Sequence, residues 1–446
     1  MRKKLSLEEG GFKYIPHTPA DLKQMMEKVG IRELDELYSD VPGEIRFRTD
    51  YDLPSEMSEL EVRQLFDRLA SQNTPLTCFA GGGVYDHYTP AIIPQMLSNP
   101  AFLTSYTPYQ AEISQGTLHY IFEYQSMMAA LTGMDVSNAS MYDGTTATAE
   151  AVLMAVAAGK KQKTVLVSET LDPKILNVLK TYAHFQGIRL VMITQRNGVT
   201  DREQMQQLLE THDVAAVLVQ QPNFFGIVED YAGFAEAAHE HKALLIMNSV
   251  AADLAVLKTP GEWGADIAVG DGQSLGIPMN FGGPYVGYLC CTDKLIRKMP
   301  GRIVGRTVDS RGQRSFVLTL QAREQHIRRQ KATSNICSNQ SLMALWVTMY
   351  MSLLGKNGLR ETGETSYAGA HYLCKMLLKT GRFSLVYDQP FFNEFVVRYD
   401  GDVALLQQRF TENGIFGGLR LADDQLMFAV TEKRTKEEID KLIALV

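Results

Sequence analysis

The chain has 446 residues, of which 45% are hydrophobic, and its formal net charge is −7 at pH 7. Such a chain buries a large core, and its mixed, slightly acidic charge excludes a nucleic-acid surface built from a dense basic patch. Short basic clusters at 160–163 and 323–331 are more typical of solvated helix faces.

The cysteines and the N-terminus restrict the cellular compartment. The five cysteines are Cys78, Cys290, Cys291, Cys337 and Cys374. They are scattered and have no metal-ligand spacing, so we expect no metal site. The first 11 residues have no apolar core of a signal peptide, and no apolar run approaches the length of a membrane span. The sequence therefore predicts a cytoplasmic protein with no membrane partner.

The first 70 residues predict a helical extension. Thr18 followed by Pro19 is typical of a helix start, and Ser58 with Glu61 three residues later forms a capping-box pattern. Apolar residues follow each start at helical spacing. Such an extension packs on its own chain or clamps onto a partner subunit.

Two segments before the first regular strand are rich in glycine and tyrosine. Three glycines precede Tyr85 and His87, and Tyr106 and Tyr109 flank a proline. Successive glycines indicate unusual backbone near a ligand or another chain. A single histidine is more often structural than a base, and the tyrosines suit an interface as well as a substrate site.

Gly144, Thr145 and Thr146 begin a predicted helix rich in alanine. The free N–H groups and the positive end of a helix can form a phosphate cradle. A well-capped helix packed through small residues explains the same pattern.

From residue 164 the chain alternates between strands and helices. Strands are predicted at 164–169, 188–193, 214–220, 243–247, 266–270 and 285–291, with helices at 172–185, 201–211 and 230–241. This alternation predicts an α/β fold with a mostly parallel sheet covered on both faces. The last two strands have no helix between them, so the sheet is expected to end in an antiparallel strand.

The C-terminal part predicts a smaller α/β domain. Helices are expected at 339–354, 361–380 and from 436, with strands near 383–387, 393–399 and 425–430. The predicted organisation is a helical extension at 1–70, a large α/β domain at 71–338 and a small domain at 339–446.

Several long motifs together resemble one family. They are GGGVYDHYTP (81–90), SYTPYQAEISQG (105–116), MYDGTTATAEA (141–151), the loop after DIAVGDGQ (266–273) and TSNICSNQ (333–340). Their order and spacing are similar to the N-terminal half of the glycine decarboxylase P-protein of the glycine cleavage system. In many bacteria and archaea this half is a separate chain. The resemblance covers nearly the whole sequence.

The resemblance implies an aspartate-aminotransferase-like fold, which is fold type I of enzymes that use pyridoxal 5′-phosphate (PLP). This cofactor needs a lysine amine and a carboxylate beside its pyridine nitrogen. The family's cofactor-bearing pattern places Gln273 at the lysine position, and no lysine lies between Lys258 and Lys294. Asn248 occupies the expected carboxylate position.

The resemblance therefore implies a subunit that lacks its own covalent cofactor. Its partner would be a second subunit that carries PLP, in an assembly of two copies of each chain. Together they would decarboxylate glycine and transfer the aminomethyl group to the lipoyl arm of the H-protein. The resemblance implies that seven residues of these motifs reach the shared active site: Tyr85, His87, Tyr106, Tyr109, Thr333, Ser334 and Asn335.

Two alternatives remain open from the sequence. In the first, the chain is a non-catalytic scaffold of the same complex. In the second, it is an independent PLP enzyme with an unusual lysine. Lys258, Lys294 and Lys331 are the candidates for that lysine, although each is more typical of a surface position.

Overall fold

The structure is a computed structural model that describes residues 16–47, 49, 51–54, 56–159 and 162–446. The predictions for the first 15 residues, and for two residues of the basic cluster at 160–163, concern positions outside the described residues. The chain divides into two compact units, Met1–Thr74 and Pro75–Val446. The boundary at 338/339 between a large and a small domain stays a prediction.

The first unit contains two helices and a short 3₁₀ helix. They are α1 (Pro19–Val29), η1 (Leu34–Tyr38) and α2 (Glu59–Ala70). The predicted start of α2 is confirmed, because the Ser58 N–H donates to Glu61 Oε2 (2.7 Å) and the Glu61 N–H donates to Ser58 Oγ (3.3 Å). No described residue from 16 to 74 is buried. The unit thus has no hydrophobic core within its described residues.

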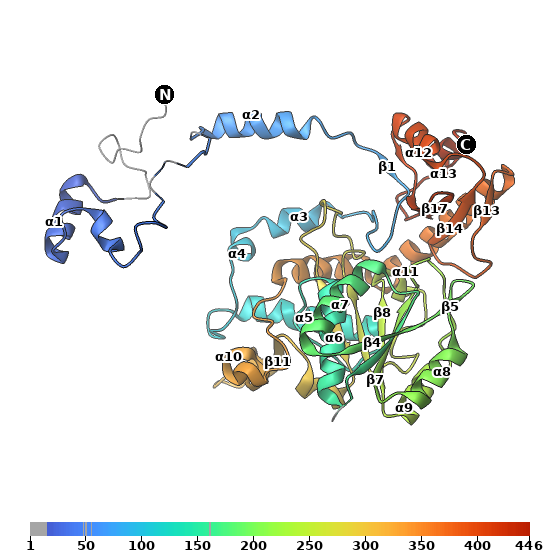
Figure 1. Cartoon of the computed structure of the whole chain (residues 1–446), viewed down its shortest axis with the longest axis horizontal. Helices are drawn as coiled ribbons and strands as arrows, with labels where there is room; N and C mark the ends of the chain where they lie inside the picture. Colours follow the sequence, from blue (N-terminus) through green and yellow to red (C-terminus); the bar gives the residue numbers. More distant parts are fainter. Residues whose placement is uncertain (1–15, 48, 50, 55, 160–161) are drawn as a thin grey trace. The chain divides into compact units, whose positions relative to one another are not determined.

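The second unit contains the remaining elements (Figure 1). Its α-helices are α3 (Ile92–Leu97), α4 (Pro100–Leu103), α5 (Gln115–Thr132), α6 (Gly144–Ala158), α7 (Pro173–Gln186), α8 (Arg202–Thr211), α9 (Phe234–Glu240), α10 (Gln325–Arg328), α11 (Ser341–Lys379), α12 (Val403–Glu412) and α13 (Lys436–Ile443). Its 3₁₀ helices are η2 (Ala252–Ala255), η3 (Asp293–Lys298), η4 (Gln321–Arg323) and η5 (Arg329–Lys331).

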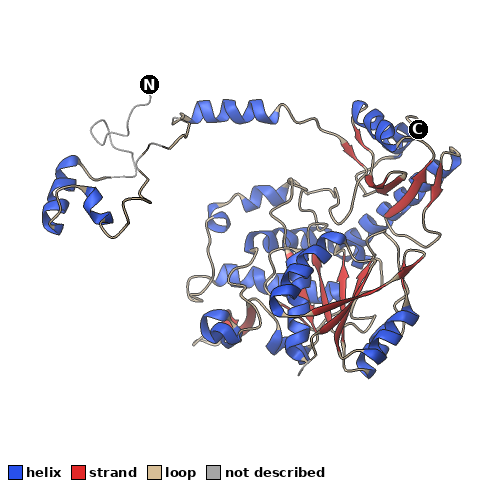
Figure 2. Cartoon of the chain, viewed as in Figure 1, coloured by secondary structure: helices blue, strands red, loops and turns tan. Residues whose placement is uncertain are grey.

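The strands of this unit form a large sheet and several smaller ones (Figure 2). The large sheet contains β2 (Val136–Ser137), β3 (Thr164–Ser168), β4 (Arg189–Ile193), β7 (Val214–Gln221), β8 (Leu244–Ser249), β9 (Ile267–Asp271) and β10 (Gly287–Cys291). The others are β1 (Thr77–Cys78), β5 (Gln195–Arg196), β6 (Val199–Thr200), β11 (Ile303–Val308), β12 (Arg314–Thr319), β13 (Phe383–Leu385), β14 (Glu394–Tyr399), β15 (Ile415–Phe416), β16 (Leu419–Ala422) and β17 (Gln425–Ala429).

The large sheet has the strand order β2-β10-β9-β8-β7-β3-β4. The five strands from β9 to β4 are parallel, and β10 is antiparallel to β9, which confirms the six predicted strands and the mostly parallel sheet. The sheet does not end at β10, because the two-residue strand β2 pairs beyond it. A strand this short leaves no periodic signal in the sequence.

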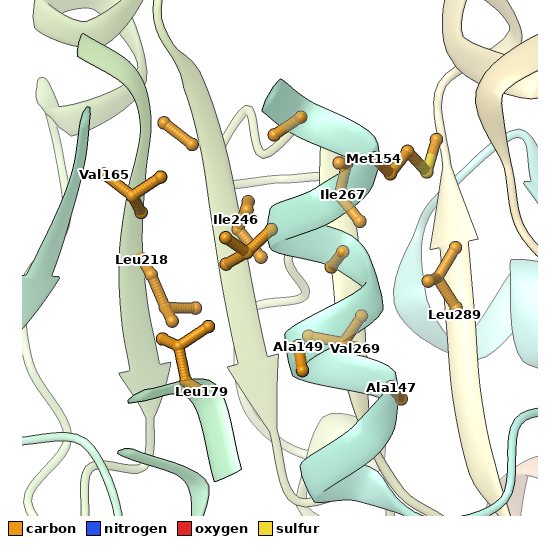
Figure 3. Close-up of a cluster of buried hydrophobic side chains, with 14 of the residues drawn as sticks. Ala147, Ala149, Met154, Val165, Leu179, Leu218, Ile246, Ile267, Val269 and Leu289 are labelled. Carbon is orange, nitrogen blue, oxygen red and sulfur yellow. The ribbon is translucent and has the colours of Figure 1, made fainter. Parts of the chain in front are cut away.

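Both faces of the sheet are buried, as the apolar strands predict. On one face α6 packs through Ala147 and Met154 against residues of the strands that include Ile246 and Val269 (Figure 3). On the other face, side chains of α8 and α9 pack against β7 and β8. The small residues of α6 allow its backbone to approach the sheet closely, and this approach sets the position of its first turn.

The C-terminal part forms a four-stranded antiparallel sheet of order β13-β14-β17-β16. The predicted helices at 339–354 and 361–380 are confirmed as the two halves of α11, which are separated by a kink at Gly355 (φ 59°, ψ −173°). Helix α12 and the hairpin β11–β12 were not predicted from the sequence. No helix within the described residues has both the length and the apolar character needed to cross a membrane.

Candidate functional site at the carboxyl edge of the large sheet

Three parallel strands end side by side where α6 begins. β7 ends at Gln221, β8 at Ser249 and β9 at Asp271, and α6 starts at Gly144. Ligands of open α/β sheets bind at this edge, so its side chains form the candidate site.

The first turn of α6 is bonded to two carboxyl groups of the chain. The Gly144 N–H donates to Asp271 Oδ2 (2.8 Å), and the Thr146 N–H donates to Asp143 Oδ1 (2.9 Å). Burial raises the pKa of Asp271 to about 7, although backbone N–H donors oppose this shift. The predicted phosphate cradle at Gly144, Thr145 and Thr146 is therefore occupied in part by the chain's own acidic side chains.

The side chain of Gln273 is buried and makes three hydrogen bonds to the backbone. Its Oε1 accepts from the Tyr85 N–H (2.9 Å), and its Nε2 donates to the carbonyl oxygens of Tyr85 (2.8 Å) and Ile277 (2.7 Å). Only 1% of Gln273 is exposed. This residue ties the loop after β9 to the segment that contains Tyr85.

Asn248 and Asp253 lie behind the same edge. Asn248 Nδ2 donates to Thr148 Oγ1 of α6 (2.9 Å), so its amide supports the helix. Asp253 is buried, and within the described residues its Oδ2 has no hydrogen-bond partner. Burial and the nearby Glu394 carboxylate raise the pKa of Asp253 well above its ordinary value, which favours the neutral carboxyl group.

Glu394 of β14 joins this region from the C-terminal sheet. Its carboxylate accepts from the Gly82 N–H (2.6 Å) and from the Tyr85 hydroxyl (3.0 Å). Lys174 Nζ also contacts this loop by donating to the Gly82 carbonyl (2.7 Å). Burial raises the pKa of Glu394 to about 7, while these donors and the Lys174 charge oppose the shift.

His87 is oriented by a carboxylate. His87 Nδ1 lies 2.7 Å from Glu432 Oε2, and the Tyr88 N–H donates to Glu432 Oε1 (2.6 Å). Burial raises the pKa of Glu432, but the hydrogen bond and charge of His87 lower it by more. Within the described residues, His87 Nε2 is buried without a hydrogen-bond partner.

A cavity of about 890 Å³ opens beside His87. It lies between the segment that follows the glycines and the loop after β9. Its lining residues are Val84, Asp86, His87, Tyr88, Thr89, Pro278, Met279, Asn280, Phe281, Gly282, Tyr285 and Lys433. Phe281 is fully exposed at its rim, which leaves a large apolar side chain free for another molecule.

The other predicted site residues lie elsewhere. Tyr106 is 82% exposed, and the Tyr109 hydroxyl accepts from the buried Arg302 (2.9 Å). Neither tyrosine is among the described residues that line the cavity. Tyr85 and His87 are thus brought together by the fold, and the two later tyrosines are not joined to them.

The 333–335 segment lies beside α6. Thr333 and Ser334 are half-buried, and Asn335 is exposed. Burial raises the pKa of Glu150, on α6, to about 7, and an interaction with the Ser334 hydroxyl opposes the shift. Ser334 is therefore placed near a buried carboxyl group that the sequence did not single out.

The sequence analysis missed the acidic residues of the site. Glu394 and Glu432 come from the C-terminal sheet and its loops, and no local pattern connects them to residues 82–88. Asp271 had a usable signal, because an aspartate at the carboxyl end of a buried strand is a common ligand position. Among the described residues, no group of three or more His, Cys, Asp or Glu side chains is placed to hold a metal ion.

The residues at the sheet edge do not fit PLP. Gln273 has no amine to bond the cofactor. Asn248 is a neutral amide that is bonded to α6, and Asp271 contacts the helix end that would bind the phosphate. The three lysines considered as replacements, Lys258, Lys294 and Lys331, are all exposed. Lys258 Nζ lies 3.7 Å from the centre of the Trp263 ring. None of these three lysines is buried at the sheet edge.

Comparisons with known proteins give a consistent result. A family model described as glycine cleavage system P-protein matches residues 12–446. The chain is 48% identical over 440 residues to a probable glycine dehydrogenase (decarboxylating) subunit 1 of Anoxybacillus flavithermus, covering 97% of this chain and 98% of that protein. The corresponding protein of Moorella thermoacetica is 47% identical over 437 residues, with the same coverage.

Solved structures extend the likeness to the fold. A crystal structure of glycine decarboxylase (P-protein) of the glycine cleavage system, in inhibitor-bound form, has a TM-score of 0.90 at 42% identity and covers 97% of this chain and 99% of that one. An alanine–glyoxylate aminotransferase from Nostoc sp. has a TM-score of 0.58 at 17% identity and covers 84% and 94%. The predicted aminotransferase-like fold is confirmed.

Proposed function

The chain belongs to the glycine cleavage system P-protein family, and from this premise we propose that it is the subunit of a two-chain glycine decarboxylase that carries no covalent cofactor. The relatives in this family are named as glycine dehydrogenase (decarboxylating) subunit 1. The observation that carries the proposal is Gln273, a buried amide that makes three hydrogen bonds inside the chain and has no amine.

The partner in this proposal is a second subunit that holds PLP on its own lysine. We propose that two copies of each chain assemble, that glycine is the substrate, and that a lipoyl H-protein receives the aminomethyl group. A closed symmetric assembly is the common arrangement for such complexes. The compartment is proposed to be the cytoplasm, and the five free cysteines support a reducing environment.

The cavity beside His87 is proposed to face the partner's active site. Tyr85 holds the cavity wall in place through Gln273 and Glu394, and His87 presents a free nitrogen whose ring is oriented by Glu432. Oriented by a carboxylate, an imidazole can hold or move a proton for a neighbouring group. Tyr106, Tyr109 and residues 333–335 are proposed as partner contacts, since three of these five residues are exposed.

The N-terminal unit is proposed as a second contact with the partner subunit. On α2 the apolar residues Val62, Leu65, Phe66 and Leu69 lie at helical spacing and none of them is buried. An apolar helix face left in water favours a protein partner.

Co-expression with the partner subunit tests the proposal. The exchange of the glycine carboxyl group with bicarbonate should require both chains and the H-protein. The single chains, each with the H-protein, are the controls. Exchange catalysed by this chain without the partner would contradict the proposal.

A scaffold without any role in the site is the second candidate. It is favoured by the position of Tyr106 and Tyr109 outside the cavity lining of the described residues. If Tyr106→Ala, Tyr109→Ala and His87→Gln all leave both assembly and turnover unchanged, the scaffold function is correct. Loss of turnover in His87→Gln with intact assembly supports a direct contribution to the site.

A further inference from the structure

The beginning of α6 is an anion site that the chain fills by itself. The four N–H groups of a first helical turn lack partners within the helix, and the helix end carries a partial positive charge. In this chain Gly144 and Thr146 donate their N–H groups to Asp271 Oδ2 (2.8 Å) and Asp143 Oδ1 (2.9 Å). Helix ends of this kind bind phosphate when no side chain fills them.

Asp271 is fixed in this position by both of its oxygens. Oδ2 accepts from the Gly144 N–H, and Oδ1 accepts from the Gln273 N–H (2.8 Å). The residue is the last of β9, so its backbone belongs to the sheet and cannot move away without disturbing the strand pairing. The carboxyl group is thus a permanent part of the helix start.

The start of α6 also lies close against the end of β9. A Cβ atom added at Gly144 would lie 2.7 Å from the Asp271 nitrogen and 2.9 Å from the Gly270 carbonyl carbon. This close approach brings the Gly144 N–H within reach of the Asp271 carboxyl group.

From these contacts we infer that Asp271 is a built-in anion that occupies the place of a cofactor phosphate and prevents PLP from binding to this chain. The inference deepens the proposed function and rests on it, since it explains why the chain carries no cofactor. It also makes a separate claim, because loss of the lysine is then only one of two barriers. Restoring an amine at position 273 alone does not restore binding.

The charges at the start of α6 support Asp271 as the second barrier to PLP binding. A PLP phosphate carries negative charge, and at this place it would meet the carboxyl groups of Asp271 and Asp143, to which no lysine or arginine among the described residues is bonded. Each carboxyl group that is deprotonated would repel the phosphate, and the repulsion is strong where water is excluded. A smaller, neutral side chain at position 271 removes both the charge and the occupied volume.

The test uses the full chain in complex with its partner. Gln273→Lys, Asp271→Ser and the double variant are each incubated with PLP and reduced with borohydride. Peptide mass spectrometry then identifies which chain carries the reduced cofactor. We expect no label on this chain in the wild type, little in Gln273→Lys, and at least about tenfold more in the double variant, the ratio that corresponds to about 1.4 kcal/mol.

A second measurement does not depend on an amine. Inorganic phosphate should raise the thermal midpoint of the full chain carrying Asp271→Ser, and it should not raise that of the wild type. If Asp271→Ser does not fold, Gln273→Lys with Asp271→Asn replaces the double variant, because asparagine keeps the shape of the residue without its charge.

The outcomes separate the proposed function of the chain from the role of Asp271. Label on the wild-type chain would overturn the proposed function. Equal label on Gln273→Lys and on the double variant, or a folded Asp271→Ser chain that gives no response to phosphate, would overturn the role of Asp271 and leave the proposed function intact.

Discussion

At the scale of single residues, Gln273 has a structural role. Its amide pairs with the N–H and the C=O of Tyr85, much as a neighbouring strand would, and it also caps the Ile277 carbonyl. A side chain without hydrogen-bonding groups would leave the Tyr85 N–H and the Ile277 carbonyl buried and unpaired, whereas the Tyr85 carbonyl still accepts from the His87 N–H (3.1 Å). Each such group is costly because it has lost its water.

We therefore expect Gln273→Leu to destabilise the chain by about 3 kcal/mol, since it leaves two buried groups without partners. The urea midpoint of the full chain measures this. The control is Gln206→Leu at an exposed position of α8, where the change should stay within about 0.5 kcal/mol. Equal midpoints for the two variants would mean that the contacts of Gln273 contribute nothing.

Glu394 gives a prediction about pH. Burial raises its pKa to about 7, whereas the pKa of an unfolded glutamate is about 4.3. Between these values the folded chain binds more protons than the unfolded chain, so this group lowers stability as the pH rises. Glu394→Gln removes that loss. The thermal midpoint of the variant relative to the wild type should rise between about pH 5 and pH 8.

The matched control for Glu394 is Glu210→Gln on the exposed face of α8. Its midpoint should follow that of the wild type at every pH. A difference between Glu394→Gln and the wild type that stays constant with pH would show that Glu394 keeps its unfolded-state pKa.

At the scale of elements, α11 is divided by a single backbone conformation. Gly355 has φ 59° and ψ −173°, a region open almost only to glycine, and an added Cβ would meet no atom within 4 Å. The two helices predicted here are the two halves of α11, which meet at this residue. The break is decided by φ and ψ rather than by packing.

Gly355→Ala should accordingly destabilise the chain by about 1–3 kcal/mol through backbone strain alone. Gly116→Ala in α5 is the control, because its Cβ also meets no atom within 4 Å and its φ lies outside the left-handed region. That change should alter stability by less than about 1 kcal/mol. Urea unfolding of both variants distinguishes them, and a neutral Gly355→Ala would indicate an uninterrupted helix.

At the scale of the whole molecule, the N-terminal unit depends on something outside its own residues. None of its described residues is buried, and Phe66 and Leu69 on α2 are exposed. We expect Phe66→Glu with Leu69→Glu to weaken binding of the partner subunit at least about tenfold, or about 1.4 kcal/mol. Sedimentation of mixed subunits measures the association.

The control for this prediction is Gln64→Glu, which adds a charge to the opposite face of α2. It should leave the association unchanged. Unchanged association in the Phe66/Leu69 variant as well would remove α2 from the interface.

The sequence by itself predicted the six longer strands of the large sheet and the starts of α1 and α2, but not α12 or the hairpin β11–β12. Capping residues such as Ser58, runs of β-branched residues and the alternation after residue 164 are local signals, and local signals fix helices and strands. The absence of lysine from 259 to 293 was also readable directly, and with the family resemblance it indicated a missing cofactor attachment.

Only the tertiary structure decided which side chains meet at the sheet edge. Asp271 meets Gly144 because α6 packs across the sheet, and Glu394 meets Gly82 across 312 residues of sequence. Such contacts depend on how elements pack, and no local propensity encodes them. The partners of the buried acidic groups could therefore not be predicted from the sequence, since a carboxylate acquires its role from neighbours that only folding provides.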